Sequence, residues 1–472
     1  MKTSVFEFKW FQKRRLHQLL AATSCNLSMF VASAAFIWLE PVTLWLISKD
    51  SEIKMTTADV SWLSACIELS SFISGLPCGI LADRWGRKLF ILSVGPICFF
   101  SWLIAFFTRD LASMYVIRLM QGFAEGACFA VGPAYIAEIS SPDIRGALGA
   151  HTVVLMYLGF LYSFSTGSYL NYENYLYSQA VLPVIFFISF VFMPESPYYL
   201  LMKSKRNKAF EALSWLRGGE DITEELNTIE EAVKEDLKKG NWRDLFATKS
   251  DRRAFFIVQI VNVATYMSGV TTVCMYATQT FVTTSLLWIT AKQLTMLISI
   301  ILCISAFLAS FVTDSIGRRK LLIISSLGIT ISNLIISIYY YLAEKTSLDV
   351  THVTWILFIG LLGLCVLTNI GVGELVHTIQ AEFFPSHTRS IGGGVTTAIS
   401  TIAIFISVKA YQPLIDMFGV YMNFVSYTVI SLISAILIVI YVQESNGKTL
   451  AEINKDICEI TNEILPQSCD KQ

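Results

Sequence analysis

Charged side chains are scarce in this chain. Of its 472 residues only 15% are charged, whereas 54% are hydrophobic. An ordinary soluble domain carries about 25% charged residues, so the composition excludes a soluble enzyme of this size. The chain also lacks a basic surplus, because 35 Lys and Arg stand against 36 Asp and Glu and leave a net charge of -1. Binding to nucleic acid is therefore not expected.

A cysteine framework is absent as well. The ten cysteines include no Cys-x-x-Cys pair, and eight of them fall singly in apolar stretches. Isolated cysteines of this kind usually act as small buried hydrophobic side chains. We therefore expect no disulfide, no metal site and no cofactor. The sequence also has no cleavable signal peptide, because Lys9, Lys13, Arg14 and Arg15 precede a long first apolar stretch and favour a cytosolic amino terminus.

Long apolar segments are what the chain does contain. A membrane-spanning helix needs about 20 predominantly apolar residues, and twelve segments are long enough. The chain is therefore predicted to be an all-α membrane protein with twelve transmembrane helices and with both termini in the cytosol. The segments lie at 16–47, 58–82, 89–108, 112–137, 147–169, 176–193, 254–282, 290–313, 320–343, 353–381, 391–415 and 421–442.

One long polar stretch divides six segments from six. Between 195 and 253, charges of both signs alternate with Leu, Ile and Ala at helical spacing, which predicts amphipathic helices on the cytosolic face. The predicted organisation is an N-terminal six-helix bundle (1–194), a cytosolic helical linker (195–253), a C-terminal six-helix bundle (254–443) and a cytosolic tail (444–472).

The two halves repeat each other in sequence. The chain reads DRWGRK at 83–88 and DSIGRRK at 314–320, after the second and the eighth apolar segments. A glutamate also precedes an arginine by seven residues in both halves, as Glu138 with Arg145 and as Glu382 with Arg389. Two repeated pairs in register with a six-plus-six pattern indicate an internal duplication.

The repeated charges are predicted to form a gate. Carboxylates and guanidiniums at cytosolic helix ends can pair in one conformation and separate in another. The alternative is that they only set topology and solubility. The gating residues predicted in this way are Asp83, Arg84, Arg87, Glu138, Arg145, Asp314, Arg318, Arg319, Glu382 and Arg389.

Taken together, these motifs resemble the sugar porter branch of the major facilitator superfamily over nearly the whole length. Further matching residues are Arg118, Gly122 and Gly126 in the fourth segment, PESP at 194–197 and GKTL at 447–450. Trp38 with Pro41, and Ser61 with Trp62, resemble the insect facilitated trehalose transporter-like group. The resemblance implies two six-helix bundles around a central cavity and alternating-access transport. It also implies a plasma-membrane location and a small-molecule solute, with a hexose or trehalose as the best single expectation; a monomer in the lipid bilayer is the default.

The chain departs from the family pattern where sugar porters bind their solute. The usual Gln-Gln pair of the seventh segment is replaced by Thr265 and Tyr266, and the following Asn by Thr271. The tenth segment reads GVGELVH at 371–377, without the family's prolines and tryptophan. Because amides donate and accept on one planar group, their loss removes much of the expected sugar recognition. The residues predicted to bind solute are Tyr266, Thr271, Thr272, Tyr276, Glu374 and His377.

Ionisable residues inside the apolar segments add to this departure. They are Glu68, Glu125, His151, Glu374 and His377, and such residues usually face a cavity and pair. Glu374 and His377 share a helix face. They could bind a cationic or nitrogenous solute, relay a proton, or form a structural pair.

Uncoupled, facilitated transport is the favoured mechanism. Ala34 lies near the place where proton-coupled sugar porters carry an acid, and Glu40 is expected to be hydrated near the outer end of the first segment. Two alternatives stay open. One is a transporter of a non-sugar or cationic solute. The other is a non-transporting sugar-sensor-like relative, which the short tail disfavours.

Overall fold

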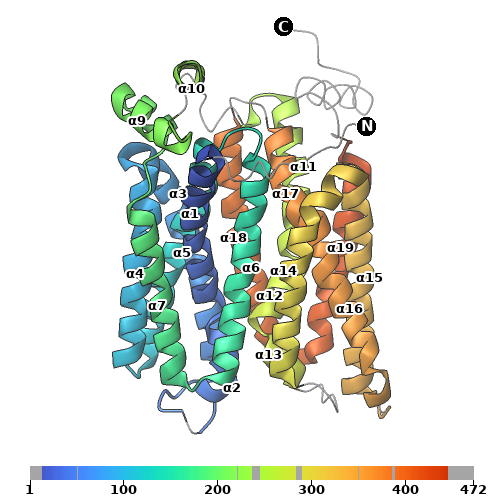
Figure 1. Ribbon diagram of the computed structural model, residues 1–472. Coiled ribbons are helices and arrows are strands. Elements are labelled where there is room, and N and C mark those ends of the chain that lie inside the picture. The colour runs from blue at the N-terminus through green and yellow to red at the C-terminus, as the bar shows by residue number, and fades with distance from the viewer. Residues whose placement is uncertain are drawn as a thin grey trace, which may run out of the picture.

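A computed structural model gives the fold (Figure 1). It describes residues 13–49, 51–219, 222–236, 245–282, 290–348, 350–384 and 388–444. Within these ranges the side chains of 13–14, 235–236, 249, 282, 310–315, 351, 381 and 389–390 are not described. Every regular element in the described ranges is a helix.

The N-terminal half is a bundle of long helices. Their apolar composition and length account for them, and Asp110 caps the fourth spanning helix by accepting from the Ser113 N–H at 2.8 Å. The helices are α1 (Lys13–Ile37), α2 (Leu39–Leu46), α3 (Thr57–Trp85), α4 (Arg87–Phe107), α5 (Leu111–Ile139), α6 (Arg145–Tyr169) and α7 (Tyr172–Val191).

The C-terminal half repeats the arrangement with more interruptions. Where the N-terminal half has one broken span, this half has two. Its elements are α11 (Lys249–Tyr266), α12 (Val270–Met275), α13 (Ala277–Val282), α14 (Ala291–Ile316), α15 (Arg318–Lys345), η3 (Thr351–Val353), α16 (Thr354–Leu367), η4 (Thr368–Gly373), α17 (Glu374–Phe383), α18 (Arg389–Phe418) and α19 (Val420–Tyr441).

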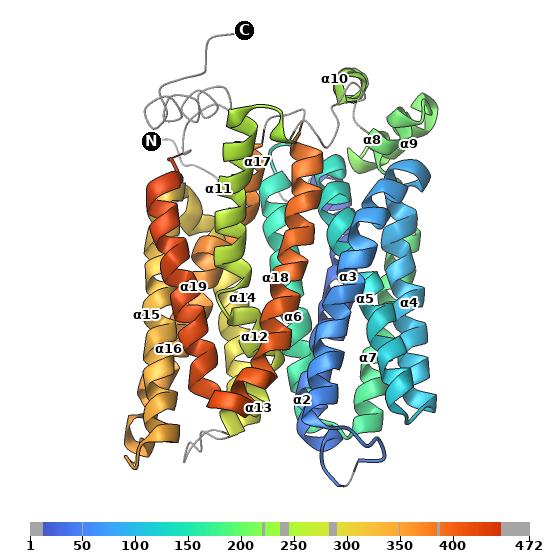
Figure 2. The same cartoon turned by 180° about the vertical axis from the view of Figure 1, so that it is seen from behind.

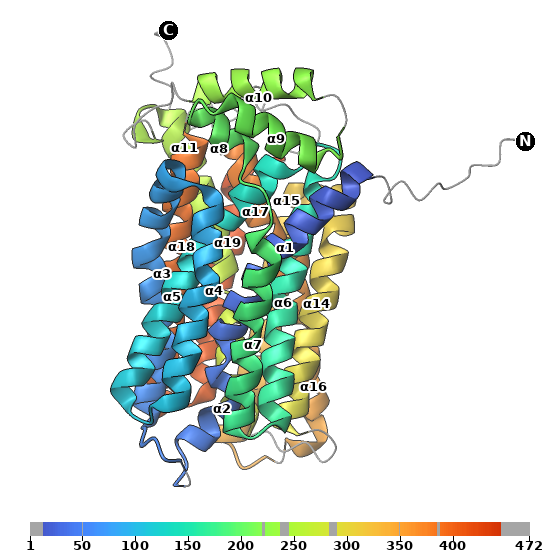
Figure 3. The same ribbon diagram turned by 60° about the vertical axis from the view of Figure 1, so that its left-hand side comes forward.

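Between the halves lie three short helices, α8 (Pro197–Met202), α9 (Arg206–Leu216) and α10 (Thr223–Asp236). They sit at one end of the bundle, at the top of Figures 1 and 3. We call this the linker end and the opposite one the far end. The described chain starts at the linker end with α1 (Figure 3) and stops there with α19 (Figure 2), so both halves cross the bundle an even number of times.

Eleven of the helices or helix series are long and apolar enough to cross a membrane. The 29-residue α5 is not among them, because Arg118 and Glu125 interrupt its apolar sequence. It nevertheless packs along α3 and α4 inside the same bundle. The chain is therefore an all-α integral membrane protein with two six-helix bundles, as the sequence predicts.

Close packing of α3 on α5 depends on two glycines. A Cβ on Gly122 would lie 2.2 Å from the Ile67 carbonyl oxygen, and a Cβ on Gly126 would lie 2.6 Å from the Ser71 carbonyl oxygen. Only glycine allows two helix backbones to approach this closely. This contact brings Glu68 and Glu125 to the same level of the N-terminal half.

Candidate functional site

Charged residues form a compact network at the linker end of the N-terminal half. Arg87 opens α4 and is 6% exposed. Its Nη2 lies 2.7 Å from Asp83 Oδ1, and its Nε donates to Glu138 at 3.2 Å. Ser196 also donates its hydroxyl to Glu138. The repeated motif therefore joins α3, α4, α5 and the start of the linker within one half.

The C-terminal half carries a looser version of this network. Arg318 opens α15, and its Nη2 lies 3.5 Å from Glu382 Oε1 on α17. Arg319 donates instead to the Val439 carbonyl at 2.9 Å. The side chains of Asp314 and Arg389, the other two predicted members, lie outside the described part. The repeat in sequence thus corresponds to a repeat in structure, although the two copies differ in tightness.

Two of the predicted gating residues stand apart from these networks. The side chains of Arg84 and Arg145 are exposed. Arg145 donates to the Ser140 carbonyl at 3.4 Å, close to its own helix end. In this conformation both are therefore available to solvent at the linker end.

Sequence reasoning missed a third component of the duplication. Gly86 has a φ of 116°, and a Cβ there would lie 2.4 Å from Glu195 Oε2. Gly317 has a φ of 92°, and a Cβ there would lie 3.1 Å from Glu444 Oε2, so Glu444 takes the place that Glu195 has in the first half. Glu195 accepts from the Lys88 N–H at 3.1 Å, and Glu444 accepts from the Arg318 N–H at 3.0 Å. The signal was present in PES at 194–196 and QES at 443–445.

Two spans of the C-terminal half are broken near their middle. The seventh span stops at Tyr266 and restarts after Gly269, whose φ of 93° is left-handed. Asn333 on α15 donates to the Ser268 carbonyl at 3.0 Å and satisfies the interrupted backbone. Breaks of this kind are tolerated in membranes only where protein or a cavity covers them.

The tenth span contains a π-helical turn, Thr368–Gly373. Gly371 within this turn lets it pack closely on α15, because a Cβ there would lie 2.0 Å from the Ser325 Cβ. The turn widens the helix just before Glu374, and π-turns inside α-helices are frequent at functional sites.

The predicted solute-binding residues divide into accessible and buried sets. Tyr266, Thr271 and Glu374 are partly exposed, and the His377 side chain is exposed. Thr272 and Tyr276 are buried. The Thr272 hydroxyl pairs with that of Ser407 at 2.7 Å, and the Tyr276 ring stacks on Tyr411 at 4.4 Å.

A cluster of neutral polar groups was not predicted from the sequence. Gln259 donates to the Thr396 hydroxyl at 2.9 Å, and Asn262 donates to the Gln259 side chain at 3.1 Å. Ser400 donates in turn to Asn262 Oδ1 at 2.6 Å. Gln259 and Asn262 are three residues apart on α11, one to two turns before Thr265. They therefore place amides on the same span that lost its Gln-Gln pair.

The buried charges of the N-terminal half surround Arg118. This guanidinium is 1% exposed and donates to the carbonyls of Leu63, Ala35 and Phe36 at 3.0 to 3.2 Å. Glu68 and Glu125 are 3% and 7% exposed. Arg118 also donates to Gln121 Oε1 at 3.3 Å, and it acts on the two carboxyls through longer-range attraction.

The halves meet along α3 with α18, α6 with α14, and α2 with α13. Near the middle, Tyr157 donates to Asn369 Oδ1 at 2.6 Å. At the far end, Glu40 accepts from the Thr278 N–H. The sequence-based expectation of a hydrated Glu40 is wrong, because α13 covers it and leaves it 4% exposed.

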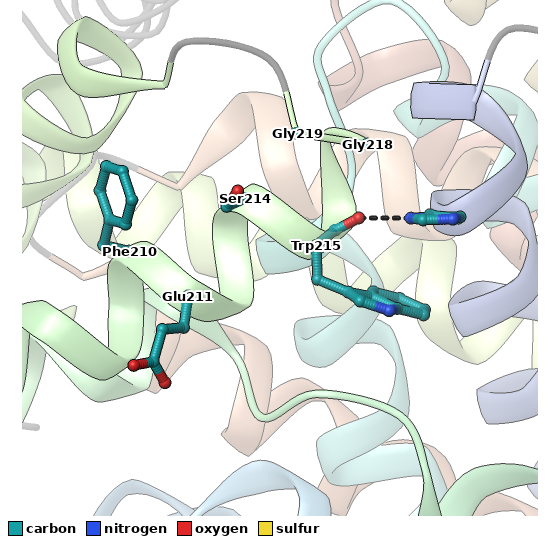
Figure 4. A pocket seen from close by; sticks show the side chains of 7 residues that line it. Phe210, Glu211, Ser214, Trp215, Gly218 and Gly219 are labelled. Carbon is teal, nitrogen blue, oxygen red and sulfur yellow. Dashed lines mark hydrogen bonds between the residues drawn. The ribbon is translucent and has the colours of Figure 1, made fainter.

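A hollow of about 420 Å³ lies at the linker end between α1 and α9 (Figure 4). His17 stacks on Trp215 at 4.7 Å and contacts its carbonyl at 2.5 Å. Arg217 reinforces this joint by donating to the Ile139 carbonyl at 3.0 Å. The hollow belongs to the docking of the linker on the N-terminal half and lies apart from the broken spans.

Comparison with known proteins decides the family. The family model "Sugar (and other) transporter" matches residues 12–457. The chain belongs to the sugar (and other) transporter family. It is similar to the facilitated trehalose transporter Tret1 of Apis mellifera ligustica, with 27% identity over 460 residues covering 96% of this chain and 91% of that protein. Tret1 of Bombyx mori is 26% identical over 443 residues, covering 92% and 86%.

Solved structures of the xylose transporter XylE share the fold. The proton:xylose symporter XylE bound to 6-bromo-6-deoxy-D-glucose superimposes with a TM-score of 0.73 at 19% identity, covering 93% of this chain and 99% of XylE. The inward open conformation of XylE from E. coli gives 0.73 at 18% identity, covering 92% and 98%. The family prediction and the prediction of a transporter rather than an enzyme are thus confirmed.

Proposed function

We propose that this chain moves a sugar, a hexose or trehalose, down its gradient by alternating access. The observation that carries the proposal is the neutral cluster of Gln259, Asn262, Thr396 and Ser400 between α11 and α18. Amides and hydroxyls donate and accept without charge, which is what polyhydroxylated solutes require. The names of the similar Tret1 proteins support the same substrate class.

The solute pathway in this proposal runs between the halves. Tyr266, Thr271, Glu374 and His377 lie on the broken spans and keep partly or fully exposed side chains, as expected of residues that reach the pathway. Thr272 and Tyr276 are proposed to line the same pathway. The charged networks of the linker end serve as the inner gate, and each holds its own helix ends together while the halves move.

The linker end is proposed to face the cytosol, with both termini there, in the plasma membrane. Basic residues gather at this end: Arg84, Arg87, Lys88, Arg145, Arg318, Arg319 and Lys320. The positive-inside rule favours this orientation. Labelling of single cysteines at Thr248→Cys and Leu348→Cys in intact cells tests it, because only the second is expected to react with a membrane-impermeant reagent.

Uptake of labelled glucose and trehalose into proteoliposomes tests the function. We expect saturable uptake that stops when internal and external concentrations are equal, at pH 6 and at pH 8 alike. Gln259→Leu serves as the site variant and Glu211→Gln, in the linker, as the matched control. Absence of uptake for both sugars would contradict the proposal.

A second candidate is a cationic organic solute, which Glu374 and His377 favour because a carboxylate on a pathway can neutralise a positive charge. Glu374→Gln separates the candidates. It is expected to leave sugar uptake within about threefold of wild type, whereas a cation carrier would lose its counter-charge. Competition of sugar uptake by organic amines gives the second readout.

A further inference from the structure

Three described contacts between the halves at the far end share one feature. A charged side chain of one half meets an uncharged group of the other. Glu40 on α2 accepts from the backbone N–H of Thr278 on α13. On another side of the same end, Lys409 Nζ on α18 lies 3.9 Å from the centre of the Trp62 ring on α3 and 3.3 Å from the Ser61 hydroxyl.

The third contact has the same feature. Lys292 at the start of α14 donates to the carbonyl of Ser168 at the end of α6, at 3.1 Å. The three contacts thus connect α2 with α13, α3 with α18, and α6 with α14. Among the described helix pairs, these three have the most extensive contact between the halves.

The linker end is built differently. The ion pairs of its repeated motif, Arg87 with Asp83 and Glu138 and Arg318 with Glu382, each lie within one half. Opposite charges held in a dry contact are costly to separate, since each leaves an unpaired charge behind. A charge on a neutral partner releases without that penalty, because each side can be hydrated alone. The far end therefore has the contacts that can open and close repeatedly.

We propose that Glu40 and the Lys409–Trp62 pair are the two clasps of the outer gate. Both are positioning residues that set the balance between far-end-closed and far-end-open conformations, and they act without touching the solute. That this gate is the outer one depends on the orientation proposed above. The two clasps depend only on the contacts between α2 and α13 and between α3 and α18.

The two clasps push this balance in opposite directions. The cation–π contact of Lys409 with Trp62 exists only when the halves touch, so its loss favours opening. Glu40 is 4% exposed, and its Oε2 is buried without a hydrogen-bond partner. Closing the far end buries this oxygen and opening exposes it to water, so the charge of Glu40 favours opening.

Electron–electron distance measurements test the clasps without a solute. Spin labels at Tyr169→Cys and Leu348→Cys, two exposed far-end positions on opposite halves, report opening in lipid nanodiscs. In this background the half-buried Cys66 and Cys303 and the tail residues Cys458 and Cys469 are replaced by serine. Lys409→Met is expected to raise the ratio of open to closed molecules about twofold to fivefold. This change corresponds to the free energy of an exposed cation–π contact. Lys409→Arg is expected to restore the wild-type ratio.

The chain offers a matched control for the cation–π clasp. Lys345 on α15 lies 5.8 Å from the Tyr421 ring on α19 at the same end, but both belong to the C-terminal half. Lys345→Met is therefore expected to leave the ratio unchanged. Trp62→Leu should open the far end as Lys409→Met does, and Trp62→Phe should largely restore closure. The double variant Trp62→Leu/Lys409→Met should show the same ratio as each single variant.

Glu40→Gln is expected to act in the other direction. The amide oxygen can still accept from the Thr278 N–H, whereas the buried charge is gone. The ratio of closed to open molecules should rise about fivefold. The external KM for influx should rise accordingly, because fewer molecules present an open outer site.

Three results would overturn the proposal. The first is an unchanged distance distribution in Lys409→Met. The second is an equal shift in Lys345→Met, which would make the effect a general loss of charge. The third is a Glu40→Gln variant that opens like Lys409→Met. Because the distances need no solute, these results are independent of whether the carried solute is a sugar.

Discussion

Buried polar side chains of different chemistry lie inside the two halves. In the N-terminal half Arg118, Glu68 and Glu125 are side chains of the uninterrupted helices α3 and α5, although Arg118 also donates to α1 carbonyls next to the break of the first span. In the C-terminal half Asn262, Ser400 and Asn333 lie beside interrupted helices. Charges that must stay buried need a rigid frame, whereas amides and hydroxyls can exchange partners at a low cost. From this difference we expect the N-terminal half to act as the frame and the C-terminal half to rearrange around the solute.

Removing Arg118 is expected to have the largest effect. Arg118→Met takes away the positive charge beside two buried carboxyls, and breaking such an arrangement costs about 3–5 kcal/mol. The variant should show strongly reduced thermal stability in detergent, measured by size-exclusion chromatography after heating. Asn262→Leu, the counterpart in the C-terminal half, should cost only about 1–3 kcal/mol. Equal losses in the two variants would break the comparison.

The charged networks of the linker end give the next largest difference. Arg87→Met leaves the half-buried Glu138 with the Ser196 hydroxyl as its partner, whereas Arg318→Met removes a looser ion pair, with 3.5 Å between Arg318 and Glu382. Uptake by Arg87→Met should therefore fall at least about tenfold, and uptake by Arg318→Met by about threefold. Both are measured at equal membrane abundance. A greater loss in Arg318→Met would show that the tighter network is the less important one.

Glycine substitutions compare the frame with the rearranging half more finely. A Cβ on Gly371 meets the Ser325 side chain, whereas a Cβ on Gly122 meets the Ile67 backbone carbonyl. Both alanine variants should lose about 1–3 kcal/mol of stability. Ser325→Gly should rescue Gly371→Ala, because it removes the obstructing Cβ, and no single side-chain change should rescue Gly122→Ala. Thermal unfolding of the single and double variants measures this.

The smallest effect is expected at Gln259. Gln259→Leu removes two neutral hydrogen bonds of the cluster, each worth about 0.5–1.5 kcal/mol. The KM for sugar should rise about threefold to tenfold with little change in thermal stability. The linker variant Glu211→Gln provides the baseline. If stability fell and KM stayed constant, Gln259 would be a packing residue.

Much of this arrangement follows from the sequence alone, for reasons that differ between elements. Apolar segments of about 20 residues dictate spanning helices, so the two bundles and the position of the linker were predictable. The π-turn at Thr368–Gly373 was not, because it depends on how Gly371 packs against Ser325 on a different helix. The burial of Glu40 also escaped prediction, since α13 covers it only when the halves meet.

The candidate site was less predictable than the fold. The family pattern points to positions 265, 266 and 271, where this chain has Thr, Tyr and Thr. The amides Gln259 and Asn262 lie outside that pattern, although their spacing of three residues places them on one face of α11. Thr272 and Tyr276 lie on the restarted helix after Gly269, where the left-handed turn rotates the face that a continuous helix would present. Local sequence gives no measure of that rotation.

The docking of the linker has a consequence for how the protein is made. Its described contacts, Arg217 with Ile139 and Trp215 with His17, are with residues of the N-terminal half. Each of these partners leaves the ribosome before α11 does. The first half can therefore be completed and closed at the linker end while the second is still being synthesised, as expected of units that fold in order during translation. The broken helices of the C-terminal half then enter the membrane beside a finished neighbour that can cover their interrupted backbone.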